Sequence, residues 1–293
     1  NTLTDEKLNN RIQSFKLKRG YMVTFATGKK GYGYSRCFIA DKADLEMNLP
    51  TLLANRVSSY RIFKWNDCSK AGLASDTRNE SNAALNTQAC YDWGTGPDMG
   101  IDRETIANHI YEDYPSSAAC GKQEYSPMMK TNNEPGNSAD DRPQSVETVL
   151  ANWENLMATG KRLCSPTSHD GSLGWLREFI DSIDARGWRC DIMDVHCYWP
   201  ESKFNELASW YSNYGNRPLW ISEWVWGASW NKNGVFTQGW DDSYRVSQNA
   251  VVVNYKISSD KELNFIDKKD NIVAETQVNK NTHIDIDKQN YLQ

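Results

Sequence analysis

The chain has 293 residues, a formal net charge of −5 and 39% hydrophobic residues. This length suits one large domain or two small ones, and a closed α/β barrel of roughly 250 residues would fit within it. No apolar run approaches the roughly 18 residues that cross a bilayer. The basic residues are scattered, which disfavours nucleic acid as a partner because phosphate binding needs clustered Lys and Arg.

Aromatic residues are abundant, with 12 tryptophans and 14 tyrosines. Several stand beside polar residues, an arrangement that suits sugars, whose apolar C–H patches are ringed by hydroxyls. Aromatic side chains also fill cores and interfaces, and composition alone favours neither interpretation.

Seven cysteines occur without a Cys-x-x-Cys pair, and the four histidines are dispersed, so a structural zinc site is not expected. One or two disulfides with a leftover thiol would be compatible with a secreted protein. The cysteines stand at positions 37, 68, 90, 120, 164, 190 and 197.

The first part of the chain predicts strands joined by long connections. Arg19–Thr27 and Val57–Trp65 are rich in β-branched and aromatic residues and are predicted strands. The segment 45–55 has a helical pattern. Residues 66–120 are rich in Asn, Ser, Asp and Gly, and predict loops with one helix near residues 102–111.

From Ser145 onwards, helical and strand patterns alternate, which indicates βα units and a parallel sheet, hence an α/β fold. The predicted helices are 145–160, 173–187 and 203–215, and the predicted strands are 162–168, 190–199 and 217–226.

The end of the chain predicts one more helix over 237–249, one more strand over 250–257 and a hairpin over 262–278. We expect residues 1–257 to form the main domain. Residues 258–293 would form a β-rich extension, either a decoration of that domain or part of an accessory domain.

Polar residues follow three of the predicted strands: Asn133-Glu134, the segment from His196 to Trp199, and Ser222-Glu223. In a parallel α/β barrel, catalytic groups project from the carboxyl ends of strands. Two glutamates that converge there would suit glycosidic cleavage, in which one carboxyl protonates the leaving oxygen and the other faces the anomeric carbon.

The residues around the two glutamates suggest supporting roles. Asn133 is placed to donate to a sugar hydroxyl, and His196 or Tyr198 to donate to Glu223 and keep it ionised. Arg61, in the predicted strand 57–65, would support Glu223 by its charge. Trp224, Trp226 and Trp230 predict sugar-stacking platforms, because Gly227 and the following polar residues indicate a loop.

Structural roles are the alternatives. Asn133 could cap a helix whose first turn contains Glu134, and His196 alone could be a core histidine. The adjacent Ser168, His169 and Asp170 are not expected to form a catalytic triad, because neighbours in sequence rarely do and no Gly-x-Ser-x-Gly motif occurs.

Five segments resemble, in order and spacing, the catalytic domain of glycoside hydrolase family 128, the endo-β-1,3-glucanase-like enzymes of fungi and bacteria. The match is close from about Asn133 to Trp230 and patchy before it. The Asn-Glu-Pro triplet is common among barrel glycosidases, whereas its combination with HCYW and LWISEW is much more specific. The segments are NNEPGN, LCSPTS, GWLREFID, DIMDVHCYW and RPLWISEW.

The resemblance implies a (β/α)8 TIM-type barrel with Glu134 as acid/base and Glu223 as nucleophile. It implies that Asn133 holds the sugar beside the cleavage point. It also places His196 and Tyr198 at the polar end of one strand and Trp199 and Trp224 in the cleft wall. The sequence departs from the family before the Asn-Glu-Pro triplet, where Lys130 and Thr131 stand in place of apolar residues.

We therefore expect a secreted or extracellular monomer that cleaves a β-linked polysaccharide, with β-1,3-glucan as the first choice, by a retaining two-glutamate mechanism. No cofactor or metal is required. Two alternatives stay open: the same mechanism on another glycan, such as an algal galactan, or a carbohydrate-binding protein without turnover.

Overall fold

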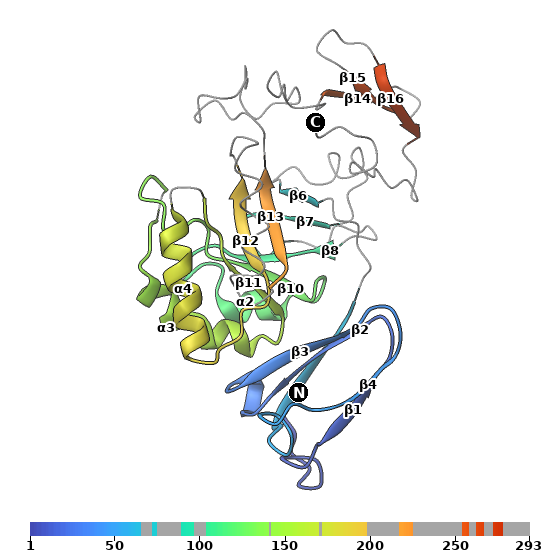
Figure 1. Cartoon of the computed structure of the whole chain (residues 1–293), viewed down its shortest axis with the longest axis vertical. Coiled ribbons are helices and arrows are strands. Elements are labelled where there is room, and N and C mark those ends of the chain that lie inside the picture. Colours follow the sequence, from blue (N-terminus) through green and yellow to red (C-terminus); the bar gives the residue numbers. More distant parts are fainter. Residues whose placement is uncertain are drawn as a thin grey trace.

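The computed structural model describes most of the chain up to Trp224 and three short strands beyond it (Figure 1). The described residues are 1–65, 72–74, 89–96, 104–140, 142–169, 172–197, 217–224, 254–257, 262–266 and 272–277.

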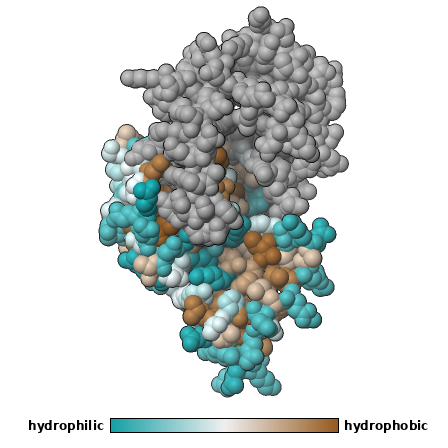
Figure 2. Space-filling model, in the orientation of Figure 1, coloured by the Kyte–Doolittle hydropathy of each residue, from teal (hydrophilic) through white to brown (hydrophobic). Residues whose placement is uncertain are grey.

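The N-terminal part consists of two small antiparallel sheets. Strand β1 (Ser14–Leu17) pairs with β4 (Leu45–Asn48), while β2 (Tyr21–Ala26) lies between β3 (Ser35–Ala40) and β5 (Ser59–Lys64). The two strands predicted from sequence in this region, β2 and β5, are confirmed. The visible surface of this part is mixed, with hydrophobic areas between hydrophilic ones (Figure 2).

The helix predicted over residues 45–55 is wrong. Along β4, the half-buried Leu45 and Met47 alternate with the exposed Glu46 and Asn48, which is the two-residue period of a strand. Pro50 then leads into a turn instead of a helix.

Parallel pairing begins after residue 65. Strand β7 (Ala89–Tyr91) lies between β6 (Gly72–Ala74) and β8 (Glu104–Thr105), and β10 (Met128–Thr131) lies between β9 (Ala107–His109) and β11 (Arg162–Pro166). Strand β12 (Met193–Cys197) pairs with β13 (Leu219–Trp224). Isolated parallel bridges link the β11 region to the β12 region, and β13 lies against β6. The described part is therefore a mixed α/β fold with parallel strands.

The helix predicted near residues 102–111 is also wrong, because β8 and β9 occupy this segment. Every residue from Glu104 to Ile110 is buried. Burial of both faces is typical of strands in a parallel sheet, and it removes the alternation by which a strand is recognised.

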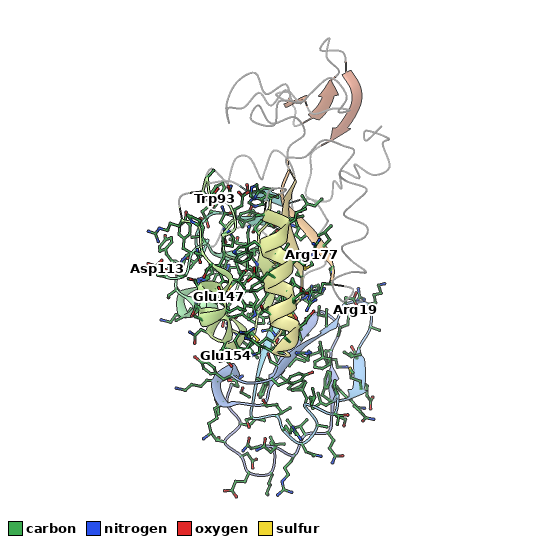
Figure 3. The ribbon with its side chains drawn as sticks, turned by 60° about the vertical axis from the view of Figure 1, so that its left-hand side comes forward. Arg19, Trp93, Asp113, Glu147, Glu154 and Arg177 are labelled. Atoms are coloured by element: carbon green, nitrogen blue, oxygen red, sulfur yellow. The ribbon has the colours of Figure 1, made fainter. Side chains whose placement is uncertain are left out.

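Three helices are described beside the parallel strands: α2 (Ser117–Lys122), α3 (Val146–Ala158) and α4 (Leu173–Ala185). The predictions of α3 and α4 are confirmed. Ser145 caps α3 by accepting a hydrogen bond from the Thr148 N–H at 3.1 Å. Figure 3 shows the charged side chains of Glu147 and Glu154 on α3 among the exposed residues.

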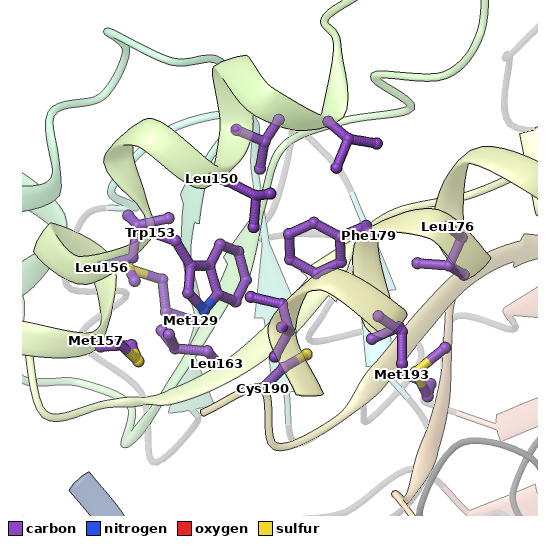
Figure 4. Close-up of a cluster of buried hydrophobic side chains, with 14 of the residues drawn as sticks. Met129, Leu150, Trp153, Leu156, Met157, Leu163, Leu176, Phe179, Cys190 and Met193 are labelled. Atoms are coloured by element: carbon purple, nitrogen blue, oxygen red, sulfur yellow. The ribbon is translucent and has the colours of Figure 1, made fainter. Parts of the chain in front are cut away.

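The main hydrophobic core lies between these helices and the strands (Figure 4). Trp153 of α3 and Phe179 of α4 meet edge to face with ring centroids 4.8 Å apart, and the Trp153 indole donates to the Arg189 carbonyl at 2.9 Å. Met129, Leu163 and Met193 contribute from the strands. The helices are thus fixed to one face of the sheet, and the other face is free to carry polar groups.

The N-terminal sheet formed by β3, β2 and β5 packs near the amino-terminal end of β11. The Thr24 hydroxyl donates to the Gly160 carbonyl at 2.6 Å, and Nε of the buried Arg189 donates to Ser35 Oγ at 3.2 Å. A Cβ on Gly31 would lie 2.2 Å from the Ala158 carbonyl oxygen, so the two backbones touch. This sheet therefore supports the end of the strands opposite to their carboxyl ends.

The C-terminal strands β14 (Asn254–Ile257), β15 (Glu262–Ile266) and β16 (Ile272–Gln277) form an antiparallel sheet in that order. The predicted hairpin is confirmed as β15 and β16. The helices predicted over 203–215 and 237–249 lie outside the described residues.

In the described part of the chain, no helix is long and apolar enough to span a membrane.

Five cysteines with described side chains, at positions 37, 90, 120, 164 and 190, are free thiols. Cys68 and the side chain of Cys197 lie outside the described part.

Lys161 provides a test of the packing at the start of β11. Its buried Nζ donates to Gln123 Oε1 at 2.9 Å and to the Ser126 carbonyl. Burial, with a contribution from the charge of Arg61, lowers the pKa of Lys161 to about 7. In the unfolded chain the pKa returns to about 10.4, so above pH ~7 the unfolded chain binds more protons than the folded one.

We therefore expect Lys161 to make the free energy of unfolding rise with pH between about 7 and 10, by at most about 1.4 kcal/mol per pH unit. Urea denaturation of the natural protein and of Lys161→Met at several pH values would measure this slope. The exposed Lys16, replaced in the same way, is the matched control. Equal slopes for the natural protein and Lys161→Met would contradict the assignment.

Candidate active site

The carboxyl ends of β7, β10, β12 and β13 bring the polar side chains of the candidate site together. Figure 1 shows β12 and β13 side by side and pointing the same way. Glu134 follows β10, His196 lies near the end of β12, and Glu223 lies near the end of β13. Because parallel strands end at the same edge, these residues meet there.

A β-bulge turns Glu223 towards His196. Val195 pairs with Ile221 and His196 pairs with Glu223, so Ser222 is an extra residue on β13. Leu219 and Ile221 pack against the hydrophobic core. Regular alternation would send residue 223 to that same face, and the bulge reverses its direction.

Glu134 is held in a backbone conformation that non-glycine residues seldom adopt. Its φ is +38°, which costs on the order of 1 kcal/mol and requires support from the surroundings. The Asn133 N–H donates to the Ile110 carbonyl at 2.9 Å. A Cβ on Gly136 would lie 2.7 Å from Cβ of Trp175, so the loop after Glu134 sits directly on α4. The alternative of a helix starting here is wrong, because α3 begins only at Val146.

His196 lies between the two carboxylates. Its Nδ1 is 2.6 Å from Oε1 of Glu134, and its Nε2 is 3.4 Å from Oε1 of Glu223. The imidazole is 1% exposed, and the two carboxylates are 13% and 14% exposed. The carboxylates are therefore accessible at the surface of the site, whereas the group that joins them is not.

The pKa of Glu134 is the result of opposing effects. Burial raises it, but the hydrogen bond and charge of His196 lower it, and Asn137 and His169 add to this. The Asn137 side chain donates to Oε2 of Glu134 at 2.6 Å. The net pKa of Glu134 is about 2, so the carboxylate is ionised with these partners.

Tyr91 contributes a hydroxyl that the sequence analysis did not identify. It donates to Oε1 of Glu223 at 3.0 Å and approaches the Ser222 carbonyl at 3.1 Å. Burial raises the pKa of Tyr91 well above its ordinary value, and the charges of Glu223 and Asp194 raise it further. The phenol therefore stays protonated and stabilises Glu223 as a carboxylate.

Trp93 is a second aromatic residue that the sequence analysis missed. Its ring meets that of Tyr91 edge to face at 6.2 Å, and it is half-buried. Figure 3 shows Trp93 at the end of the helices where the connections from the strands emerge. The segment ACYDWG, a short apolar run followed by polar residues and a glycine, was the available signal for both residues.

The other predicted residues differ in how the structure places them. The Asn133 amide donates to Asp140 Oδ2 at 3.2 Å, beside the candidate pair. Trp224 ends β13, and its side chain lies outside the described part, as do Tyr198, Trp199 and Trp226.

The expectation that Arg61 supports Glu223 is corrected by the structure. Arg61 donates to the Thr159 carbonyl at 2.7 Å and lies 3.7 Å from Glu124, at the end of the molecule where β11 begins. It lies on β5 of the antiparallel sheet, not on a parallel strand that leads to the site.

His169 contributes to the surroundings of Glu134, because its charge lowers the pKa of that carboxyl. Its Nδ1 lies 2.6 Å from Ser172 Oγ, and Ser168 Oγ lies 3.1 Å from the same hydroxyl. Asp170 is outside the described residues. The described contacts therefore agree with the expectation of a structural role.

The chain was compared with known proteins. No protein-family model matches it, and no curated protein sequence matches it. A subgroup I endo-β-1,3-glucanase of glycoside hydrolase family 128 from Amycolatopsis mediterranei, in complex with laminarihexaose, is 26% identical over 53% of this chain and 70% of that chain, with a TM-score of 0.44.

Two further solved structures are similar to this chain. The Amycolatopsis enzyme in complex with laminaritriose is 23% identical over 59% of this chain and 75% of that chain, with a TM-score of 0.47. A subgroup VI exo-β-1,3-glucanase from Aureobasidium namibiae is 13% identical over 60% of this chain and 88% of that chain, with a TM-score of 0.44. These structural neighbours are glycoside hydrolases of the family that the sequence motifs resemble.

The contact between His196 and Glu134 predicts an unusual titration. In the natural protein, the Glu134 carboxyl should titrate near pH 2. In His196→Gln the hydrogen bond and charge that lower the Glu134 pKa most are lost, while burial, Asn137 and His169 remain, so the midpoint should rise towards about 4.5. Carbon-13 NMR of glutamate-labelled protein would follow it, with Glu134→Gln to assign the signal.

Stability provides a second readout for the same contact. The folded pKa of Glu134 is depressed, so its stabilising contribution is present above about pH 4.5 and is lost as the pH falls towards about 2. An unchanged midpoint in His196→Gln would show that His196 does not set the state of Glu134.

Proposed function

We propose that this chain is a glycoside hydrolase that cleaves β-1,3-glucan within the chain and with retention of anomeric configuration. One observation carries the proposal: a buried imidazole lies between two partly exposed glutamates, Glu134 after β10 and Glu223 near the end of β13. A pair of carboxyl groups is the minimum equipment for glycosidic cleavage.

In the first step, a Glu223 carboxylate oxygen forms a bond to the anomeric carbon while the glycosidic C–O bond breaks. Glu134 gives its proton to the leaving oxygen. In the second step, Glu134 takes a proton from water, whose oxygen attacks the same carbon and releases Glu223. Tyr91 and His196 support Glu223 as the ionised partner.

Glu134 must be protonated before it can act as the acid. Asn137 and His196 both stabilise its ionised form. A glucan that enters the site excludes water and replaces one of these contacts with its leaving oxygen. Both changes favour the neutral carboxyl, so binding itself would prepare the acid.

The proposed cleft takes its polar contact from Asn133 and its aromatic surface from Trp93, Tyr198, Trp199, Trp224 and Trp226. Flat aromatic faces suit the apolar patches of glucose units. The described parallel strands would belong to a (β/α)8 barrel within residues 1–257, preceded by the antiparallel N-terminal sheets. Residues 258–293 would form a β-rich extension. The protein would act as an extracellular monomer.

A product assay tests the activity. The purified protein should convert laminarin or curdlan into short oligosaccharides, and Glu134→Gln and Glu223→Gln should each lower kcat by roughly 10²–10⁴-fold. If only mixed-linkage glucan, xylan or agar is cleaved, the assignment of β-1,3-glucan as substrate is wrong and the two-glutamate mechanism stands. Tight binding without products after long incubation would identify a carbohydrate-binding protein.

Azide rescue of the two glutamate variants tests the assignment of roles. On an aryl β-glucoside oligomer with a good leaving group, the acid/base variant Glu134→Ala should form a β-glycosyl azide, because Glu223 still forms the covalent intermediate. Glu223→Ala should form the α-azide directly. Proton NMR distinguishes the two anomers. The opposite pattern would exchange the roles of the glutamates, and an inverted hydrolysis product would rule out retention.

A further inference from the structure

Lys130 is a fully buried cation in β10, four residues before Glu134. Its side chain and that of Asp194 are both 0% exposed, and Nζ lies 3.3 Å from Asp194 Oδ2. Thr167 joins them, since its hydroxyl accepts from Lys130 and donates to Asp194 Oδ2 at 3.0 Å. Lys130 and Asp194 therefore form a buried ion pair that the Thr167 hydroxyl bridges.

This ion pair lies on the face of the sheet that carries the candidate site. Met129 and Met193, the chain neighbours of Lys130 and Asp194, belong to the hydrophobic core under the helices. Because side chains alternate along a strand, Lys130 and Asp194 point to the opposite face. On β12, Asp194 precedes His196 by two residues and shares its face.

Tyr91 connects the ion pair to the candidate nucleophile. Lys130 Nζ lies 5.4 Å from the centre of the Tyr91 ring, and the Tyr91 hydroxyl donates to Glu223. The charge of Asp194 acts on Tyr91 together with that of Glu223. Without Lys130, a second buried negative charge would therefore stand beside the Tyr91–Glu223 hydrogen bond.

Stability alone does not explain a lysine at this position. Interiors of parallel barrels are usually filled by Val, Ile and Leu. Replacement of a buried ion pair by apolar side chains is often neutral or stabilising, because both charges must lose their hydration. The contact of Lys130 with the ring that supports Glu223 offers a functional reason.

We propose that Lys130 is a positioning residue for Glu223: it cancels the charge of Asp194 and holds the Tyr91 ring, so that the Tyr91 hydroxyl meets an ionised Glu223. The kinetic consequence rests on the glycosidase function proposed above. The electrostatic consequence does not, because it concerns only the titration of a carboxyl group.

The two partners should shift the titration of Glu223 in opposite directions. Lys130→Met leaves Asp194 uncompensated and should raise the midpoint by roughly one pH unit. Asp194→Asn leaves Lys130 uncompensated and should lower it by a similar amount. The double variant contains neither charge and should return to within about 0.3 of a unit of the natural value.

Carbon-13 NMR of glutamate-labelled protein measures these midpoints in the full chain, with Glu223→Gln to assign the signal. Tyr91 and His196 are titratable groups with described contacts to Glu223, and Glu134 lies beyond His196. Each keeps its identity in all three variants. Lys16→Met, an exposed lysine of the N-terminal part, is the matched control and should leave the midpoint unchanged.

Kinetics on laminari-oligosaccharides completes the test. Lys130→Met should lower kcat by roughly 10–100-fold with KM changed less than about threefold, because the sugar contacts are intact. The double variant should recover most of kcat. A merely structural role would lower the melting temperature without shifting the midpoint or separating kcat from KM.

Each outcome decides the inference. If the titration midpoint of Glu223 is unchanged in both Lys130→Met and Asp194→Asn, the inference is overturned, whatever the kinetic result. Shifted midpoints with unchanged kcat overturn the positioning role. If the natural protein cleaves no glucan, the proposed function fails, while the titrations still decide whether Lys130 sets the state of Glu223. If Lys130→Met does not fold, the downward shift in Asp194→Asn and its reversal in the double variant decide.

Discussion

The geometry of the candidate site depends on one interaction, the contact of the buried His196 imidazole with two glutamates. His196 reaches both carboxylates only because two local departures from regular structure occur at the carboxyl ends of the strands, one after β10 and one on β13. The bulge at Ser222 turns Glu223 away from the hydrophobic core, and the left-handed backbone of Glu134 turns its side chain back towards β12. Neither departure is favourable alone, so the packing around each must maintain it.

The sheet achieves this by having two faces of different character. One face is hydrophobic and holds α3 and α4 through contacts such as Trp153 with Phe179. The other face carries Lys130, Asp194 and Tyr91, which are buried but polar. A hydrophobic layer adapts to small changes in shape, whereas a network of charges and hydrogen bonds has few acceptable arrangements. Polar packing beneath the carboxylates therefore restricts their positions more than apolar packing would.

The elements that could be predicted from sequence are those in which apolar and polar residues recur with the regular spacing of a helix or a strand. The amphipathic helices α3 and α4 and the strands β12 and β13 were found because each keeps its pattern. The segment 45–55 misled because the short strand β4 runs into a turn. Strands β8 and β9 were missed because they are short, with two and three residues, and are buried on both faces, whereas β12, which is buried too, still alternates apolar and polar residues in MDVHC. The two glutamates and His196 were found at strand ends. Tyr91 was missed because β7 has only three residues, and Arg61 was misassigned because the sequence does not show that β5 belongs to the antiparallel N-terminal sheet.

Lys130 shows why local sequence could not complete the site. Read alone, a lysine before the Asn-Glu-Pro triplet is a departure from an apolar strand, and no pattern in β10 indicates its partner. The partner lies 64 residues later, on β12, and the bridging hydroxyl of Thr167 follows β11. A buried cation is acceptable only when an anion meets it, and the topology alone decides that Asp194 does. The positions of the two carboxylates at strand ends could therefore be predicted from sequence, whereas the charge balance beneath them depends on which strands become neighbours.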